Sequence, residues 1–181
     1  MNDFKFCPNC GSNKISNINM RKWYCPDCNF ELYNNIASAV GVIIQDKFHN
    51  VLFEIRAKNP KKGYVALPGG FVDRDETAEE AVIRECKEEI GFTVEKPHYI
   101  CTNPNTYLYK NIEYKTCDIF YKVPLPEQFS SIEDFIKVLK PQESEVVKFV
   151  TYRVENESDV DKIPLAFESS KFTLKRLLGG I

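Results

Sequence analysis

The chain of 181 residues lacks three features that would assign it to a broad class at once. No run approaches the ~18 to 20 apolar residues of a membrane-spanning helix, and no basic segment followed by an apolar one marks a signal peptide. Neither sign of charge dominates, because 24 Lys and Arg face 26 Asp and Glu, a net charge of -2. This balance removes the electrostatic drive of a dedicated nucleic-acid binder. We therefore expect a cytoplasmic protein with no membrane partner and no nucleic-acid partner.

Histidine is also scarce. The two histidines, His49 and His98, have no spacing typical of a ligand pair, and we interpret both as structural. The hydrophobic fraction of 43% is sufficient for a core and too high for a disordered chain. The length allows one full domain and a small appendage.

Cysteine, in contrast, is abundant near the N-terminus. Four of the seven cysteines precede residue 30, and they form two C-x2-C pairs separated by 14 residues. An odd total without a secretion signal argues against a disulfide framework, and free or redox-active thiols are the weaker alternative. Two such pairs suit the tetrahedral four-thiolate coordination of structural zinc. The expected zinc ligands are Cys7, Cys10, Cys25 and Cys28, whereas Cys86, Cys101 and Cys117 are interpreted as small buried hydrophobic residues.

Residues 1–34 are accordingly predicted to be a zinc ribbon, because their few apolar side chains could not hold a fold without metal. Four basic and three acidic residues give this segment a net charge of +1, which is unfavourable for RNA binding. We expect the ribbon to be structural or to support a homodimer.

Residues 35–181 are predicted to form a second domain of class α+β, because strands outnumber helices without regular alternation. Gly179 and Gly180 are expected to end the last helix. The predicted strands cover residues 36–44, 51–55, 98–102, 113–123 and 146–152, and the predicted helices cover 77–90, 132–139 and 169–178.

The helix over 77–90 is the best bounded of these elements. Thr77 and Glu80 have the T-x-x-E spacing of a capping box, and Gly91 suits the left-handed residue that follows a helix. The segment from Asp73 to Glu89 contains eight acidic and three basic residues, a local net charge of -5.

Three carboxylates gather on one side of this helix. At roughly 100° per residue, Glu85, Glu88 and Glu89 lie along the edge of its apolar stripe. Like charges beside an apolar surface require a cation, and hard carboxylate oxygens suit Mg²⁺ or Mn²⁺. The alternative is an ordinary solvated acidic face. Gly69 and Gly70, just before the helix, would allow the backbone to approach a metal or a phosphate.

This region resembles the signature of the Nudix hydrolases, G-x5-E-x7-R-E-U-x-E-E-x-G-U, where U is a bulky apolar residue. Cys86 and Phe92 occupy the two apolar places, and Cys86 departs from the usual Ile, Leu or Val. The seven fixed positions are all present as Gly70, Glu76, Arg84, Glu85, Glu88, Glu89 and Gly91.

The resemblance implies an α/β/α sandwich around a mixed sheet, and hydrolysis of a nucleoside diphosphate linked to another moiety. By position, Glu85, Glu88 and Glu89 would hold the catalytic metal. A main-chain oxygen of Gly69 or Gly70 would complete its coordination. Glu76 and Arg84 would hold the loop and orient the carboxylates.

The general base and the substrate contacts are less well defined by the sequence. Glu143 and Glu145 are candidates for the base, with an exposed acidic turn as the alternative. Arg56, at the end of a strand, could reach a phosphate. Tyr107 and Tyr109 could contact a base, with core packing as the alternative.

Two classes of function follow. The first is a metal-dependent pyrophosphohydrolase acting on ADP-ribose, a dinucleotide or a sugar nucleotide. A ribbon before the signature resembles the NADH pyrophosphatase branch, but its downstream S-Q-P-W-P-F-P-x-S motif is missing. The alternative is a nucleotide-sensing or RNA- or protein-binding module with little turnover.

Overall fold

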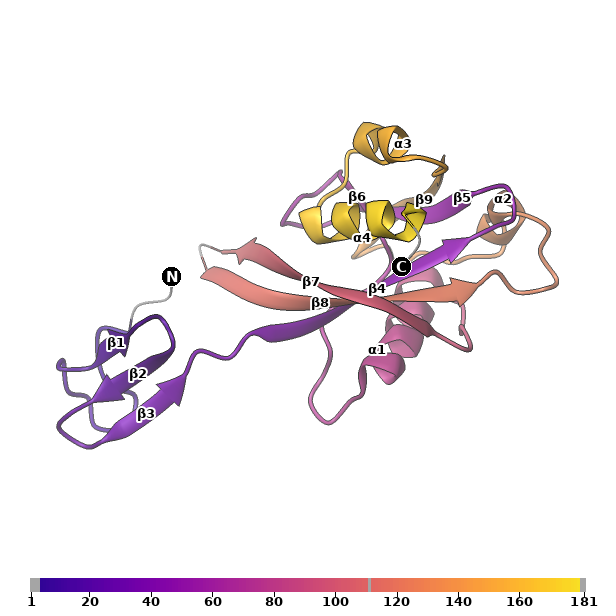
Figure 1. The fold of residues 1–181 in the computed structure, drawn as a ribbon. Coiled ribbons are helices and arrows are strands. Elements are labelled where there is room, and N and C mark those ends of the chain that lie inside the picture. Colours follow the sequence, from indigo (N-terminus) through magenta and orange to yellow (C-terminus); the bar gives the residue numbers. More distant parts are fainter. Residues whose placement is uncertain (1–3, 111, 180–181) are drawn as a thin grey trace.

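The computed structural model describes residues 4–110 and 112–179, and their strands form two sheets (Figure 1). The smaller sheet has the order β1-β2-β3, and the larger has the order β6-β5-β4-β8-β7 with β9 paired to β5. The strands are β1 (Ser16–Ile18), β2 (Lys22–Cys25), β3 (Phe30–Tyr33), β4 (Ala37–Gln45), β5 (Asn50–Arg56), β6 (Val65–Ala66), β7 (His98–Tyr109), β8 (Ile112–Pro124) and β9 (Val146–Arg153). The helices are α1 (Ala78–Glu85), the π-helix η1 (Cys86–Ile90), α2 (Ile132–Ile136), α3 (Glu157–Lys162) and α4 (Glu168–Leu178).

The six-stranded sheet is mixed. Strands β4 and β8 run parallel, with Ala39 opposite Asp118 and Gly41 opposite Phe120, whereas the other paired strands are antiparallel. Parallel neighbours require a crossover connection, and the chain between β4 and β8 includes α1 and η1. The predicted α+β class with a mixed sheet is confirmed.

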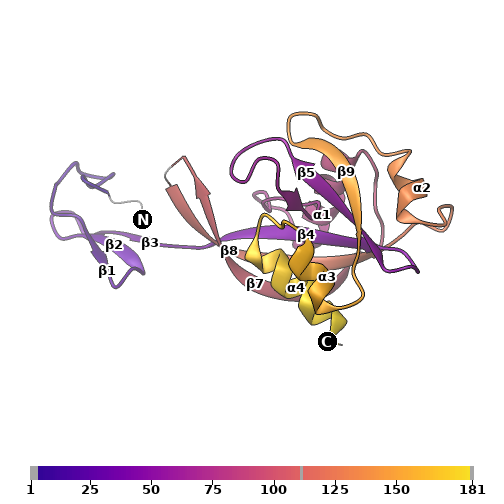
Figure 2. The same cartoon turned by 90° about the horizontal axis from the view of Figure 1, so that it is seen from above.

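Helices cover both faces of this sheet, as the two views show (Figures 1 and 2). Val40 and Val42 of β4 pack in one core with Val82 of α1. Ile43, which points to the opposite face because strand side chains alternate, packs in a second core with Leu174 of α4. These two cores give the three-layer sandwich that the family resemblance implied.

The helix predicted over 77–90 is confirmed in its boundaries but not in its geometry. The capping box of Thr77 and Glu80 is formed, and Gly91 has a left-handed φ of 68°. The prediction used about 100° per residue throughout, as in an α-helix, whereas residues 86–90 form a π-helix, whose hydrogen bonds span five residues instead of four.

Other elements differ from the prediction in length or were missed. Strand β7 continues to Tyr109, beyond the predicted end at residue 102, and α2 ends at Ile136 instead of residue 139. Helix α3 was not predicted. Val160 is its only buried residue, so its sequence has no repeat of apolar positions that would indicate a helix. Gly179 caps α4 as predicted, whereas Gly180 lies outside the described residues. Among the described helices, none combines the length and the apolar character needed to cross a membrane.

The three-stranded sheet has a small core of its own, formed by Cys7, Ile15, Trp23 and Cys25. In both views it lies apart from the larger sheet and is joined to it by the segment that leads into β4 (Figures 1 and 2). This sheet therefore depends on few apolar contacts.

Candidate functional site

A cavity of about 270 Å³ lies between β4, the segment 67–71 and the C-terminal end of α1 with η1. Its floor includes the small residues Ala39 and Gly41. A Cβ atom on Gly41 would lie 2.6 Å from the ring of Phe120, so a larger residue there would require this ring to move. Acidic, basic and aromatic side chains all line this cavity, and we call the three groups defined below the acidic, basic and aromatic walls.

The acidic wall consists of Glu85, Glu88 and Glu89, which line the cavity together. Glu85 is 9% exposed and Glu89 3%, whereas the side chain of Glu88 is 51% exposed. Burial raises the pKa of Glu85, and it raises the pKa of Glu89 to about 8. The helix therefore holds two carboxylates in an environment that disfavours their charge.

Two glycines allow the backbone to lie against these carboxylates. The Gly69 N–H donates to Oε2 of Glu89 at 2.7 Å, and Gly69 has a φ of +141°. A Cβ atom there would lie 2.1 Å from the carbonyl oxygen of Val40, and one on Gly70 would lie 2.4 Å from Oε1 of Glu85. Neither position has room for a side chain without movement of its neighbours.

Arg84 ties the loop before α1 to the acidic wall. It donates to both carboxylate oxygens of Glu76, at 2.8 and 2.9 Å, and its Nη1 donates to Glu85 at 2.8 Å and to Glu88 at 3.3 Å. Its Nη2 also donates to the carbonyl oxygen of Phe71 at 2.9 Å. Hydrogen bonds from Arg84 lower the pKa of Glu76. Arg84 and Glu76 thus lie where they can hold the loop and orient carboxylates.

The sequence interpretation missed Glu54, a carboxylate on β5 that is 1% exposed. Burial, and then the charge of Glu89, raises the pKa of Glu54 well above its ordinary value. Its Oε2 atom has no hydrogen-bond partner among the described residues. The available signal was an acid inside the apolar run 51–55, on the same face of the strand as Leu52.

These observations test whether the site suits a divalent cation. Glu54, Glu85 and Glu89 are buried carboxylates, and only Glu85 has a basic side-chain partner, Arg84, in the described part of the chain. Hard oxygen ligands of this kind are those that Mg²⁺ and Mn²⁺ prefer. The residues present therefore fit such an ion.

The basic wall comes from the last residue of β5 and from the loop that follows it. Arg56 and Lys58 line the cavity, and Lys58 forms an ion pair with Glu145. The sequence had identified Arg56 but not Lys58. Of the two candidate bases, Glu145 lines the cavity, and Glu143 is not among its lining residues.

The aromatic wall consists of Phe71, Tyr107 and Phe167. Tyr107 stacks on Phe167 with ring centroids 5.8 Å apart, and Phe71 meets Tyr107 edge-on at 5.5 Å. Tyr109, a predicted substrate contact, is 39% exposed and does not belong to the cavity lining. The structure thus brings Tyr107 to the site and leaves Tyr109 outside it.

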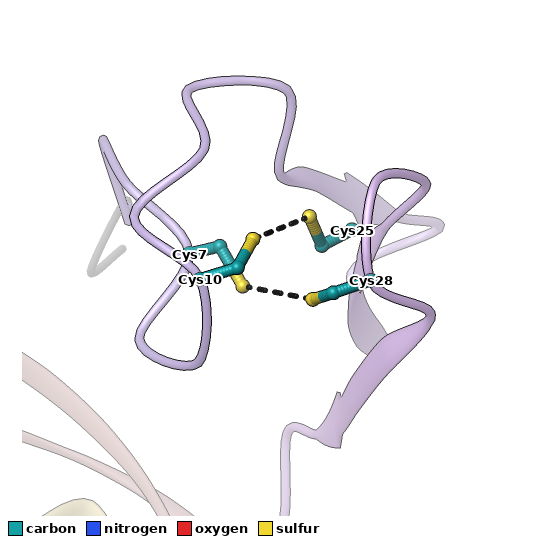
Figure 3. A group of neighbouring side chains, drawn as sticks. All are labelled: Cys7, Cys10, Cys25 and Cys28. Atoms are coloured by element: carbon teal, nitrogen blue, oxygen red, sulfur yellow. Dashed lines mark hydrogen bonds between the residues drawn. The ribbon is translucent and has the colours of Figure 1, made fainter.

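The four N-terminal cysteines form a second candidate site (Figure 3). Their sulfur atoms all lie within 4.8 Å of one another, with Cys7 and Cys28 paired at 3.7 Å and Cys10 and Cys25 at 3.7 Å. This group could bind a metal ion. The carboxylates of the acidic wall form no equally close group in the described part of the chain.

Comparison with known proteins identifies a matching family model and several relatives. A family model described as the NUDIX domain matches residues 36–167. An ADP-ribose pyrophosphatase of Methanocaldococcus jannaschii is 53% identical over 62 residues, which cover 34% of this chain and 36% of that protein. A NAD-capped RNA hydrolase of Schizosaccharomyces pombe is 31% identical over 116 residues, covering 56% of this chain and 31% of that protein. The chain thus spans about a third of the length of these curated relatives.

Solved structures share the fold. The Nudix domain of NrtR from Shewanella oneidensis, in complex with ADP ribose, has a TM-score of 0.60 at 21% identity and covers 85% of this chain and 91% of that one. A Nudix hydrolase from Nitrosomonas europaea has a TM-score of 0.59 at 22% identity, and it covers 97% of this chain and 89% of that one.

Proposed function

This chain belongs to the Nudix family, and we propose that it is a metal-dependent pyrophosphohydrolase. Its substrate would be a nucleoside diphosphate linked to another moiety, of the ADP-ribose, dinucleotide or sugar nucleotide class. The names of the relatives, an ADP-ribose pyrophosphatase and NAD-capped RNA hydrolases, support this class.

The observation that carries the proposal is the burial of three carboxylates beside a cavity that also holds Arg56 and Lys58. Burying acids is costly, and Glu54 and Glu89 have no basic side-chain partner among the described residues, so such a cluster is expected where a cation offsets it during function. The cations of Arg56 and Lys58 supply positive charge on another wall of the same cavity. A pyrophosphate in this cavity would find both ligands for its counterion and basic groups for its own oxygens.

Glu85, Glu88 and Glu89 would hold the divalent cation, with a main-chain oxygen of Gly69 or Gly70. When bound, Mg²⁺ or Mn²⁺ supplies the positive charge that offsets the dense negative charge of the substrate. Arg84 holds the carboxylate of Glu85 in place through its hydrogen bond at 2.8 Å. Arg56 would contact a phosphate oxygen.

Glu145 is the better candidate for the general base, because it lines the cavity and its side chain is 30% exposed. It would accept a proton from the water that attacks phosphorus. Lys58, its ion-pair partner, positions this carboxylate and would keep it from turning toward bulk water. The backbone supports the same arrangement, since the Ala57 N–H donates to the Glu145 carbonyl oxygen at 2.7 Å.

Glu89→Gln tests the proposal. We expect it to lower Mg²⁺-dependent hydrolysis by at least about 100-fold, because several kcal/mol of charge stabilisation depend on the ion. The assay is product formation from ADP-ribose, NAD and a sugar nucleotide with Mg²⁺ or Mn²⁺. Glu79→Gln is the matched control, since Glu79 lies on α1 outside the cavity lining and a glutamine can still accept from the Tyr121 hydroxyl.

The alternative is a module that binds a nucleotide with little turnover. It predicts nucleotide binding by the wild-type protein and no hydrolysis of any member of the panel with either metal. Undiminished hydrolysis by Glu89→Gln would instead place the reaction at another site.

We also propose that residues 1–34 are a zinc ribbon and that residues 35–181 form the Nudix domain, the outermost residues of both lying outside the described part of the chain. For tetrahedral zinc with bonds of about 2.3 Å to sulfur, neighbouring sulfur atoms lie about 3.8 Å apart. The two sulfur pairs at 3.7 Å support this ion. The ribbon would be structural or would support a homodimer.

A further inference from the structure

The cavity lining includes a further buried carboxylate, which the proposed reaction does not use. Asp118 of β8 lines the cavity and is 8% exposed. It lies between Ala39 of β4 and Asn103 of β7 in the sheet, so its backbone is fixed on both sides. Ala39 is small and also lines the cavity, which leaves Asp118 accessible from it.

Three side chains donate hydrogen bonds to this carboxylate. Ser169 Oγ and Asn105 Nδ2 donate to Oδ2 at 2.6 and 2.9 Å, and Thr116 Oγ1 donates to Oδ1 at 2.6 Å. The Asn105 amide is fixed in orientation, because its Oδ1 accepts from the Thr106 N–H at 2.8 Å. A carboxylate has about four acceptor sites, so the group presents a remaining acceptor, and a ligand must bring a donor.

Flat aromatic surfaces line the same cavity. Tyr107 stacks on Phe167, Phe71 meets Tyr107 edge-on, and the guanidinium of Arg56 lies 5.1 Å from the Phe167 ring centre. Each ring is held by its neighbour, which suits contact with another planar ring. The combination of flat walls and a buried acceptor favours a planar ring with a donor on its edge over a sugar or a phosphate.

We propose that Asp118 determines which substrate this site accepts, by taking a hydrogen bond from an amino group on a planar ring of the nucleotide. The inference rests on the proposed function, because it names the part of the substrate that the same cavity selects. Adenine offers its exocyclic amino group, and nicotinamide offers the NH2 of the carboxamide attached to its ring. Hypoxanthine and nicotinic acid place oxygen there instead, and an oxygen facing the carboxylate is repelled.

Equilibrium binding tests the inference separately from catalysis. The probes are NAD, its hypoxanthine analogue and its nicotinic acid analogue, and the protein is the Glu89→Gln variant, which should not consume them. We expect NAD to bind about 10- to 100-fold more tightly than the analogue that lacks the recognised amino group, since a lost hydrogen bond to a buried charged group has an effect of this size. The analogue that binds more weakly shows whether Asp118 contacts the adenine or the nicotinamide.

Asp118→Asn in the same background should reduce this preference to less than about three-fold, because an asparagine amide can present either a donor or an acceptor. The matched control is Thr173→Val. Thr173 is a hydrogen-bonded neighbour of Ser169, because its hydroxyl donates to the Ser169 carbonyl oxygen at 2.8 Å and accepts from Asn103 at 2.8 Å. Thr173 does not line the cavity. This control should keep the preference.

In the enzyme with Glu89 intact, Asp118→Asn should alter KM for NAD and the analogues much more than kcat, because the contact is made equally in ground and transition states. Equal affinity for NAD and both analogues would overturn the inference even where hydrolysis is intact. So would a preference that survives Asp118→Asn, or one lost equally in Thr173→Val. Selective binding without turnover of any nucleotide would overturn the proposed function and leave the inference standing.

Discussion

The close contact between Gly70 and the acidic wall can be tested by adding a single methyl group. Gly70 does not have a left-handed φ, so alanine can adopt its backbone conformation without strain. The added Cβ atom would lie 2.4 Å from Oε1 of Glu85 and 2.7 Å from its Cδ. Ordinary contacts begin near 3.4 Å, so in Gly70→Ala the carboxylate must retreat by about 1 Å.

This retreat should affect activity far more than stability. Arg84 holds Oε1 of Glu85 at 2.8 Å, so a shift of the carboxylate also disturbs that hydrogen bond. A misplacement of about 1 Å in a positioning group can cost about 100-fold in rate, or about 2.7 kcal/mol of transition-state stabilisation. Alanine restricts the unfolded chain and adds up to about 1 kcal/mol of stability, which offsets much of the local cost.

The assay is kcat/KM for ADP-ribose over a series of Mg²⁺ concentrations, with thermal unfolding measured in parallel. Gly179→Ala is the control, because its Cβ atom would have its nearest neighbour, the carbonyl oxygen of Arg176, at an ordinary 3.7 Å. It should leave activity unchanged, and it should raise stability by no more than about 1 kcal/mol because it restricts the unfolded chain in the same way. Full activity of Gly70→Ala at the wild-type Mg²⁺ requirement would refute the reasoning, because it would mean that the position of the Glu85 carboxylate does not matter.

Two further predictions concern other parts of the chain. Purified protein should contain about one equivalent of zinc. The variant Cys25→Ser should release this zinc and unfold the ribbon, whereas the control Cys117→Ser should retain it. A zinc-free wild-type protein with an intact ribbon would contradict the assignment. Asp46 accepts from the backbone N–H groups of Phe48, Asn50 and Ile132 at 2.8 to 3.1 Å. Burial opposes ionisation of Asp46, but these hydrogen bonds outweigh it and lower its pKa. Its contribution to stability is therefore present above the unfolded pKa of about 3.9 and is lost as pH falls through the lower folded value. Asp46→Asn should reduce the free energy of unfolding by about 1 to 3 kcal/mol at pH 7 and by much less near pH 2, measured by denaturant titration; an equal loss at both pH values would count against it.

The sequence by itself determined the features that depend on neighbouring residues. The capping box of Thr77 and Glu80 and the left-handed Gly91 were predicted correctly, because helix ends are specified by side chains within a few positions. The spacing of the four cysteines likewise predicted that their sulfur atoms would meet, since each C-x2-C pair closes within one turn. The predominance of predicted strands over helices, without regular alternation, led to the α+β class.

Only the tertiary structure decided which distant residues line the cavity or lie close to its acidic wall. Glu54, Lys58 and Asp118 come from separate strands and loops, and their proximity to the acidic wall depends on how β4, β5 and β8 pair. The same pairing brings Tyr107 to the aromatic wall and leaves Tyr109 outside the cavity lining. Such proximity reflects packing between segments that lie far apart in the chain, where no local spacing or cap can specify it.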